Sequence, residues 1–408
     1  MDSKLNELNW DERIRASVAQ SGPHPEGSSE WRWGTFKQTD VPEKGLMDRY
    51  VNIKPWNHNR VRLHVPPGQL DYVNASTIRL QSPSDRSRPP LSYIAMQGPT
   101  EPSIPYVWRM ISEQVQSPAV IVQLTNNIES GNLKCNAYFP DADDVGPWPV
   151  NEDDVWEDDW QATLSFESME PLYDGIIEKT RLRLQVEGKE PITVWHFLYT
   201  RWPDFGVPPL DEMDSFFELM RLSREHSSPA GPRVIHCSAG VGRTGTFICL
   251  EHLIRELDVG GLSDPPSNGH ARVEPKDAQD PVFNTVDMLR QQRRGMVQGE
   301  TQYRFIYSVM KKLWEDKHNP PRLPRIRQPA AIDDEDEDMA EGGASIQRTR
   351  DPTPNDVDSD PFYDSNSPAR RAANNNSKSN NTNDDDDDDD DEDDGGARVR
   401  PDGPSDGK

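Results

Sequence analysis

The sequence is poor in cysteine and lacks any long hydrophobic run. Its three cysteines, Cys135, Cys237 and Cys249, are too few for a disulfide framework, and their spacing fits no common zinc site. No apolar segment approaches the ~20 residues that span a bilayer, and the first residues lack a charged-then-apolar secretory pattern. We therefore expect a soluble chain of the cytoplasm or the nucleus, with reduced cysteines and no metal site.

Basic residues are few relative to acidic ones, with 45 Lys and Arg against 71 Asp and Glu. The formal net charge is −26 at pH 7, and residues 319–408 contain 25 acidic and 11 basic residues, which leaves −12 to the first 318 residues. Because phosphate repels an acidic surface, this balance argues against binding to nucleic acid or anionic membranes. The unbroken acidic run from Asp384 to Asp394 repels itself and buries little apolar surface, so residues 319–408 are predicted to be a disordered acidic tail.

Apolar strands alternate with helical patterns between the two ends of the chain. Short β-branched or alternating runs predict strands, and apolar residues at helical spacing predict helices. The predicted strands are 119–124, 192–199 and 233–236, and the predicted helices include 246–257 and 282–294. Interleaved strands and helices indicate an α/β domain, and we expect a highly twisted mixed sheet flanked by helices.

Composition also suggests the domain boundaries. Residues 1–30 form a predicted N-terminal extension, a helical piece followed by a loop, and residues 31–318 form the predicted folded domain. Within that domain, residues 141–160 are acidic and contain several Trp and Pro residues, which suggests a surface insertion. Residues 258–280 are rich in Gly, Pro and Asp and are predicted to be a second loop insertion.

One motif carries the chemistry. Cys237 follows a predicted strand, Arg243 stands six residues later where a helix begins, and small residues fill the loop between them: Ser238, Ala239, Gly240, Val241 and Gly242. Such a loop can turn its N–H groups inward to hold an anion, assisted by the positive end of the helix. Arg243 could bind two phosphate oxygens, and the same field would keep Cys237 a thiolate nucleophile, with Thr244 donating a hydrogen bond to the sulfur as it leaves.

Two other interpretations of this motif were weighed. Cys237 could be a buried structural cysteine in a glycine-rich turn, but the full His-Cys-x5-Arg-Thr-Gly pattern is present. A P-loop nucleotide site would need a Gly-Lys-Ser/Thr sequence, which is missing here. The pattern therefore favours a phosphate-transferring cysteine.

The segment from Val234 to Phe247 resembles the signature loop of protein tyrosine phosphatases, and the similarity covers roughly residues 31–313. Trp202-Pro203-Asp204 resembles that family's mobile acid loop. The resemblance implies that Asp204 protonates the tyrosine leaving oxygen and then activates water. The segment with Gln298 and Gln302 resembles the glutamine loop, which implies that Gln298 positions that water.

The resemblance also assigns substrate-binding and supporting residues. Tyr50 lies in a segment similar to the recognition loop and would stack on the phosphotyrosine ring, while Asn52 stands where the family usually has a substrate-binding aspartate. Glu129 is expected to orient Arg243, Lys134 to approach the acid loop, and His236 to tune the thiolate. The resemblance implies no metal or organic cofactor, because Arg243, the loop and the helix end supply the positive field.

Two other functions were compared with this interpretation. A non-catalytic phosphotyrosine-binding module could dispense with Cys237 and Asp204, which are both present. A dual-specificity or lipid phosphatase would have a shallower or more basic pocket, whereas Tyr50 implies depth and the loop after Cys237 holds no lysine. The expected partners are phosphotyrosine-containing proteins, with MAP kinases suggested by a general resemblance to insertion-rich fungal phosphatases. Cys135 and Cys249 are expected in the core.

Overall fold

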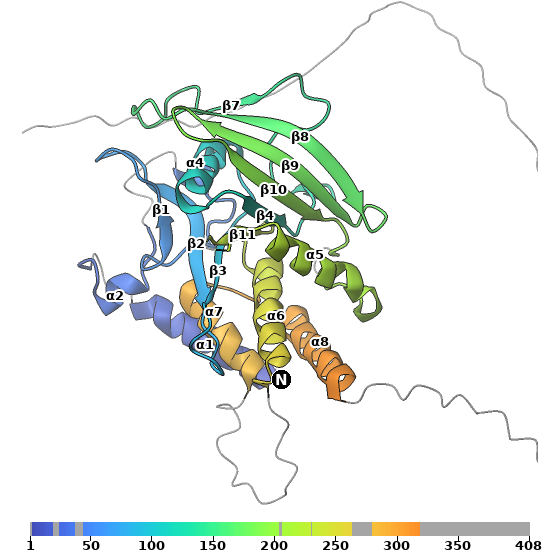
Figure 1. Ribbon diagram of the computed structural model, residues 1–408. Coiled ribbons are helices and arrows are strands. Elements are labelled where there is room, and N and C mark those ends of the chain that lie inside the picture. The colour runs from blue at the N-terminus through green and yellow to red at the C-terminus, as the bar shows by residue number, and fades with distance from the viewer. Residues whose placement is uncertain are drawn as a thin grey trace, which may run out of the picture. The chain divides into compact units, whose positions relative to one another are not determined.

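A computed structural model describes residues 2–18, 24–36, 44–203, 206–229, 231–262 and 280–318. Nine strands of this part form one twisted mixed sheet in the order β1-β2-β3-β11-β4-β10-β9-β8-β7 (Figure 1). The four central strands β3, β11, β4 and β10 run parallel, and the outer pairs are antiparallel. The sheet strands are β1 (Arg60–Arg62), β2 (Tyr72–Leu80), β3 (Leu91–Met96), β4 (Ala119–Gln123), β7 (Trp148–Val150), β8 (Ala162–Leu172), β9 (Ile177–Val186), β10 (Ile192–Tyr199) and β11 (Arg233–His236). A small separate hairpin consists of β5 (Ile128–Glu129) and β6 (Asn132–Leu133).

Helices cover both faces of the sheet, as Figure 1 shows. Alternate residues of β4 separate the two cores: Val120 and Val122 pack with the helices α1, α5, α6, α7 and α8, whereas Ala119 and Ile121 pack with α4. The helices are α1 (Asp2–Val18), α2 (Ser29–Arg32), α3 (Lys44–Met47), α4 (Ile104–Gln114), α5 (Met213–Glu225), α6 (Gly242–Asp258), α7 (Pro281–Gln292) and α8 (Glu300–His318), with short 3-10 turns η3 (Glu101–Ser103) and η4 (Leu210–Glu212). Within the described ranges, no helix has the length and apolar character needed to cross a membrane.

The predicted elements agree with this α/β architecture. The predictions for 192–199 and 233–236 coincide with β10 and β11, and that for 119–124 corresponds to β4. The predicted helices correspond to α6 and α7, although α6 begins four residues before the expected 246 because the glycine-containing loop closes directly into its first turn. The N-terminal helix α1 is also present, with Leu5 and Leu8 buried in the core.

The acidic segment 141–160, which we expected to be a surface insertion, contributes to the fold. Its strand β7 pairs with β8, and the indole of Trp156 is fully buried. The Arg109 guanidinium lies 4.5 Å from the Trp156 ring and donates two hydrogen bonds to Asp158. These contacts anchor the segment against α4. The other proposed insertion (its residues 263–279) and the tail 319–408 lie outside the described residues.

Candidate active site

The loop that joins β11 to α6 is held in place by hydrogen bonds that its carbonyl oxygens accept from residues outside the loop. Four of its oxygens accept hydrogen bonds: Ser238 O from Gly98 N at 2.9 Å, Ala239 O from Arg293 Nη2 at 3.3 Å, Gly240 O from Arg293 Nε at 2.9 Å, and Val241 O from Val297 N at 3.1 Å. In a planar trans peptide, the N–H points away from the carbonyl to which it is bonded. The N–H groups that follow these carbonyls therefore face the opposite side, where the loop borders a cavity.

Gly240 is required by the shape of this loop. Its φ of +69° is in the left-handed region, and a Cβ added there would lie 1.9 Å from the carbonyl oxygen of Met96. Any side chain would therefore force the loop away from β3. This close approach explains why the motif contains a glycine at this position.

A cavity of about 400 Å³ lies at the start of α6 and collects most of the predicted site residues. Cys237 is only 4% exposed at its wall. The lining residues come from the segment after α3, the β5–β6 hairpin and the residue after it, the loop before α6 with the first turn of α6, and the segment before α8 with the first turn of α8. They are Tyr50, Asn52, Ile53, Glu129, Lys134, Cys237, Ser238, Ala239, Gly242, Arg243, Gln298 and Gln302. Of these, only Ile53 was not predicted.

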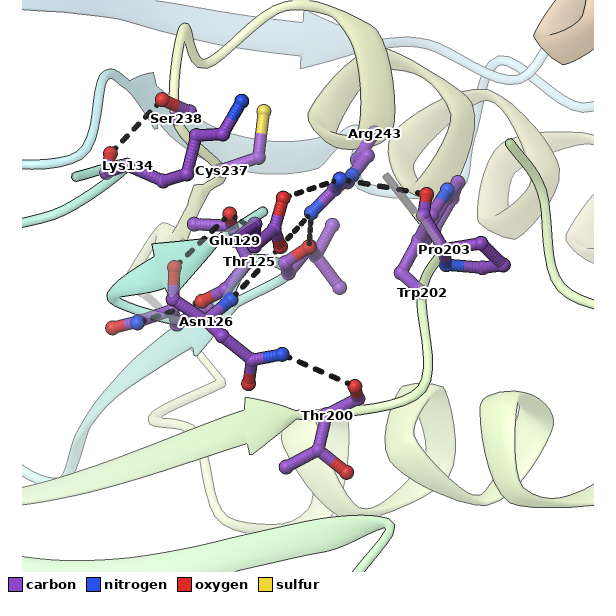
Figure 2. A network of polar contacts seen from close by, with 12 residues as sticks. Thr125, Asn126, Glu129, Lys134, Thr200, Trp202, Pro203, Cys237, Ser238 and Arg243 are labelled. Atoms are coloured by element: carbon purple, nitrogen blue, oxygen red, sulfur yellow. Dashed lines mark hydrogen bonds and ion pairs between the residues drawn. The ribbon is translucent and has the colours of Figure 1, made fainter. Parts of the chain in front are cut away.

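The signature arginine is oriented by a buried carboxylate. Arg243 donates to the two oxygens of Glu129 at 2.6 and 2.8 Å and to the Leu124 carbonyl at 3.0 Å (Figure 2). Burial opposes ionisation of Glu129, but the hydrogen bonds and charge of Arg243 outweigh it and lower the pKa of the carboxyl. The pair is therefore charged at neutral pH, and Glu129 holds the guanidinium of Arg243 at the wall of the cavity that Cys237 also lines.

Tyr50 and Lys134 meet at Ser238. The Tyr50 hydroxyl lies 2.8 Å from Ser238 Oγ, which in turn donates to the Lys134 carbonyl at 2.9 Å. Figure 2 shows the Lys134 amino group pointing to the same side as the Cys237 sulfur. The recognition segment and the hairpin are thus joined across the loop, with an aromatic ring at one wall of the cavity and a cation at another.

His236 is completely buried behind the cysteine. Its Nε2 lies 2.9 Å from the Tyr138 hydroxyl, and its Nδ1 lies 3.3 Å from the Cys237 carbonyl oxygen. Burial lowers the pKa of His236 to about 4, against a weaker opposing effect of the Cys237 carbonyl. The imidazole is therefore neutral near pH 7, and it contacts the backbone of Cys237 without lining the cavity.

The segment before α8 and the first turn of that helix bring two glutamines to the cavity, Gln298 and Gln302 respectively. Gln298 and Gln302 both line it, and Gly299 N donates to Gln302 Oε1 at 3.2 Å. The backbone just before Gln298 is tightly held, because Arg290 donates to the carbonyls of Met296 and Val297 at 3.0 and 3.1 Å. Gln298 is thus presented from a fixed backbone.

The predicted acid loop is described only in part. Trp202 is buried and donates from Nε1 to Gly206 O at 3.0 Å. The Pro203 carbonyl accepts a bond from Arg243 Nη2 at 3.4 Å, as Figure 2 shows. Asp204 itself lies outside the described residues. Its chain neighbour Pro203 nevertheless lies beside the signature arginine.

Gly240, Val241 and Thr244, which were also predicted as site residues, do not line the cavity. Val241 and Thr244 are fully buried and do not line it, and no hydrogen-bond partner for Thr244 Oγ1 is found in the described part of the chain. The expected bond from Thr244 to sulfur therefore stays a prediction. As expected, Cys135 and Cys249 are core residues, and burial raises the pKa of Cys135 to about 12.

Sequence reasoning missed the residues that hold the site from behind. Arg293 is fully buried, binds two loop carbonyls and also donates to Asn74 Oδ1 at 2.8 Å. Burial lowers its pKa to about 10, so it stays charged at neutral pH. Tyr138 and Arg290 were likewise not predicted. The sequence carries only a weak signal for the two arginines, because arginines in a helical pattern are ordinarily solvated.

Comparisons with known proteins agree with this geometry. Residues 46–312 match the family model for the protein-tyrosine phosphatase domain. Tyrosine-protein phosphatase 1 of Saccharomyces cerevisiae is 33% identical over 301 residues, covering 70% of this chain and 87% of the yeast protein. A putative receptor-type tyrosine-protein phosphatase of Aedes aegypti is 33% identical over 274 residues, 66% of this chain but only 18% of that relative's length. The chain thus spans about a fifth of the length of this relative and of two others, from Drosophila melanogaster and Homo sapiens. The fold resembles PTPN18 solved with HER2 phosphopeptides, with a TM-score of 0.56, 23% identity and coverage of 77% and 99% of the two chains.

Proposed function

The chain belongs to the protein tyrosine phosphatase family, and on that premise we propose that it hydrolyses phosphotyrosine in proteins through a phosphocysteine intermediate. One observation supports this most directly. Cys237, Arg243 and a loop of which four carbonyl oxygens accept hydrogen bonds from outside border the same cavity, so the proposed nucleophile and phosphate-binding groups face one space.

In the first step, the Cys237 sulfur attacks phosphorus while the bond to the tyrosine oxygen breaks. Arg243 and the inward N–H groups stabilise the charge on the three phosphoryl oxygens. Asp204 donates a proton to the departing phenolate, because a neutral phenol leaves more readily. The proximity of Pro203 to Arg243 supports Asp204 in this role.

In the second step, a water molecule attacks the phosphocysteine. Gln298, which lines the cavity, orients the water, and Asp204 accepts its proton. The phosphorus–sulfur bond breaks, inorganic phosphate leaves, and Cys237 returns to its starting state. Neutral His236 and the charged Glu129–Arg243 pair keep the nucleophile and the guanidinium in place during both steps.

We propose phosphotyrosine as the substrate class because Tyr50 forms a wall of the cavity and is anchored through Ser238. A deep pocket lets the long phosphotyrosine side chain reach Cys237, whereas the phosphoserine side chain is too short to do so.

A role in signal transduction, with phosphorylated MAP kinases among the substrates, is the finer part of this proposal. Capture of a phosphorylated MAP kinase by a Cys237→Ser variant, competed by a phosphotyrosine peptide, would support it.

The direct test compares one peptide carrying phosphotyrosine, phosphoserine or phosphothreonine, with EDTA present. We expect turnover of the phosphotyrosine peptide alone. Cys237→Ser should abolish it, and Asp204→Ala should slow it by roughly 10²–10⁴.

Two results would contradict the proposal. Binding of the phosphotyrosine peptide by the unaltered chain without turnover would indicate a phosphotyrosine-binding module. Equal turnover of the three peptides would indicate a dual-specificity phosphatase, and the depth assigned to Tyr50 would then be wrong.

A further inference from the structure

A second cavity, of about 360 Å³, lies over strands β8, β9 and β10, on the same face of the sheet as α4. Side chains at alternate positions of these strands form its floor, and the segment that follows β6 forms its other wall. The residues that line it are Gln123, Asn127, Ala137, Tyr138, Phe139, Asp141, Ala142, Asp143, Phe166, Met169, Glu178, Thr180, His196 and Leu198. Its size is within the range of natural small-molecule pockets.

The floor of this second cavity is mainly apolar, with Phe166, Met169 and Leu198 among its residues; its polar members are Thr180, Glu178 at its edge, and a mutually paired His196 and Gln123. His196 and Gln123 are both buried, and His196 Nε2 lies 3.1 Å from Gln123 Oε1. Phe139 packs on the imidazole with ring centroids 4.5 Å apart. Burial lowers the pKa of His196 well below its usual value, so the floor carries no positive charge at neutral pH. An aryl or alkyl group would therefore fit against these walls.

The rim of the second cavity is acidic. Asp141, Asp143 and Glu178 line it, and no lysine or arginine of the described chain does so. The active-site cavity has the opposite net charge, since two cations, Lys134 and Arg243, and one carboxylate, Glu129, line it. The two cavities should therefore select ligands of opposite charge.

We propose that the second cavity is a binding site for a small amphipathic cation, an aryl or alkyl amine whose apolar part occupies the pocket and whose ammonium group faces the acidic rim. Burial of the apolar part would supply most of the affinity, and the carboxylates would supply the preference for a cation.

Occupancy of the second cavity should affect catalysis, because its lining residues also hold the active site. The Tyr138 hydroxyl contacts His236, which contacts the Cys237 carbonyl. Gln123 Nε2 donates to the Thr125 carbonyl at 2.8 Å, and the Thr125 hydroxyl donates to Glu129, the partner of Arg243. A ligand that presses on Tyr138 or Gln123 would displace groups that position the nucleophile, and small displacements reduce turnover.

The test uses 2-phenylethylamine as the cationic probe and 2-phenylethanol as its neutral counterpart. Binding to the full-length Cys237→Ser variant is measured by calorimetry with inorganic phosphate present to occupy the active-site cavity. We expect a Kd of about 1 mM for the amine. Glu178→Gln should weaken amine binding by about threefold, and Ala137→Trp, which fills the mouth, should abolish it. Glu187→Gln, an exposed carboxylate outside the cavity, is the matched control and should leave the Kd unchanged.

The binding arm does not depend on enzymatic activity, so it can fail or succeed independently of the proposed function. Equal affinity for the amine and the alcohol, or unchanged amine binding in Ala137→Trp, would overturn the proposed site. The kinetic arm rests on the proposed function and uses 4-nitrophenyl phosphate as substrate. We expect the amine to lower kcat with KM unchanged. A rise in KM alone, or no change in kcat at saturation, would contradict the coupling through Tyr138 and Gln123.

Discussion

At the scale of single residues, Glu129 shows how a buried charge acts through another residue. It lies 8% exposed and binds both terminal nitrogens of Arg243, so the guanidinium has one orientation in the cavity. Removing one partner of a buried ion pair leaves the other uncompensated, which is much costlier than losing an exposed pair. The pair therefore couples stability to the orientation of Arg243, the proposed phosphate-binding group.

For Glu129→Gln we expect kcat/KM for a phosphotyrosine peptide to fall by about 10²-fold and the free energy of unfolding to fall by about 3 kcal/mol. Steady-state kinetics and urea unfolding would measure the two effects. Glu170→Gln is the matched control, because Glu170 is exposed and paired with Lys179 at the surface. A Glu129→Gln protein with normal kinetics would show that Arg243 does not need this partner.

Gly240 gives a second residue-scale prediction. Gly240→Ala combines left-handed backbone strain with a clash against the Met96 carbonyl. Gly188→Ala, at φ +72° with open space around its Cβ position, carries only the strain, about 1–2 kcal/mol. Thermal unfolding should therefore show a larger loss for Gly240→Ala, and only that variant should lose phosphatase activity. Equal losses would mean that the loop can move away from β3 without cost.

At the scale of elements, α1 is tied to the segment that presents Gln298. Glu12 accepts a hydrogen bond from Gly295 N at 2.7 Å, and Asn9 accepts one from Arg290, whose other nitrogens hold the Met296 and Val297 carbonyls. The helix thus supports the backbone that presents Gln298 to the cavity, and in the proposed mechanism Gln298 acts in the second step.

We expect Glu12→Ala to slow hydrolysis of the phosphocysteine up to about tenfold while leaving its formation unchanged. Rapid-quench kinetics would show this as a larger burst of product followed by a slower steady state. Glu7→Ala changes an exposed carboxylate of the same helix and should behave like the unaltered chain. Slower burst and steady-state phases together would place the effect of Glu12 in the first step.

The sequence predicted some elements of the fold and missed contacts between distant ones. The buried strands β4, β10 and β11 were predicted because β-branched runs are a local signal. The burial of Trp156 was not predicted, because its partner Arg109 is 47 residues away in the sequence and the acidic residues around Trp156 indicate an exposed segment. The cavity residues followed from motifs, whereas Arg293 and Tyr138 act through contacts with segments far along the chain, which composition does not encode.

At the scale of the whole molecule, buried histidines should make stability depend on pH. His252 is 1% exposed in α6, and burial lowers its pKa from 6.5 to about 4. The unfolded chain therefore binds a proton at higher pH than the folded chain does, so stability is full above pH 6.5 and is lost as the pH falls toward 4.

Urea unfolding between pH 7 and pH 4.5 would test this linkage. His252 should contribute a loss of up to about 1.4 kcal/mol per pH unit within that window, and His252→Gln should flatten the profile by this amount. The control His64→Gln, which changes a histidine with an 81% exposed side chain, should keep the profile of the unaltered chain. An unchanged slope for His252→Gln would show that His252 is not the group that titrates.

The measurement that tests the central claim most directly is chemical trapping of the intermediate. The unaltered chain and its Gln298→Ala variant are mixed with a phosphotyrosine peptide, quenched within milliseconds, digested and analysed by mass spectrometry. The account predicts phosphate on Cys237, in a larger fraction of the Gln298→Ala molecules, and on neither Cys135 nor Cys249. Turnover of the peptide with no phosphate on Cys237 in either protein would contradict the proposed mechanism.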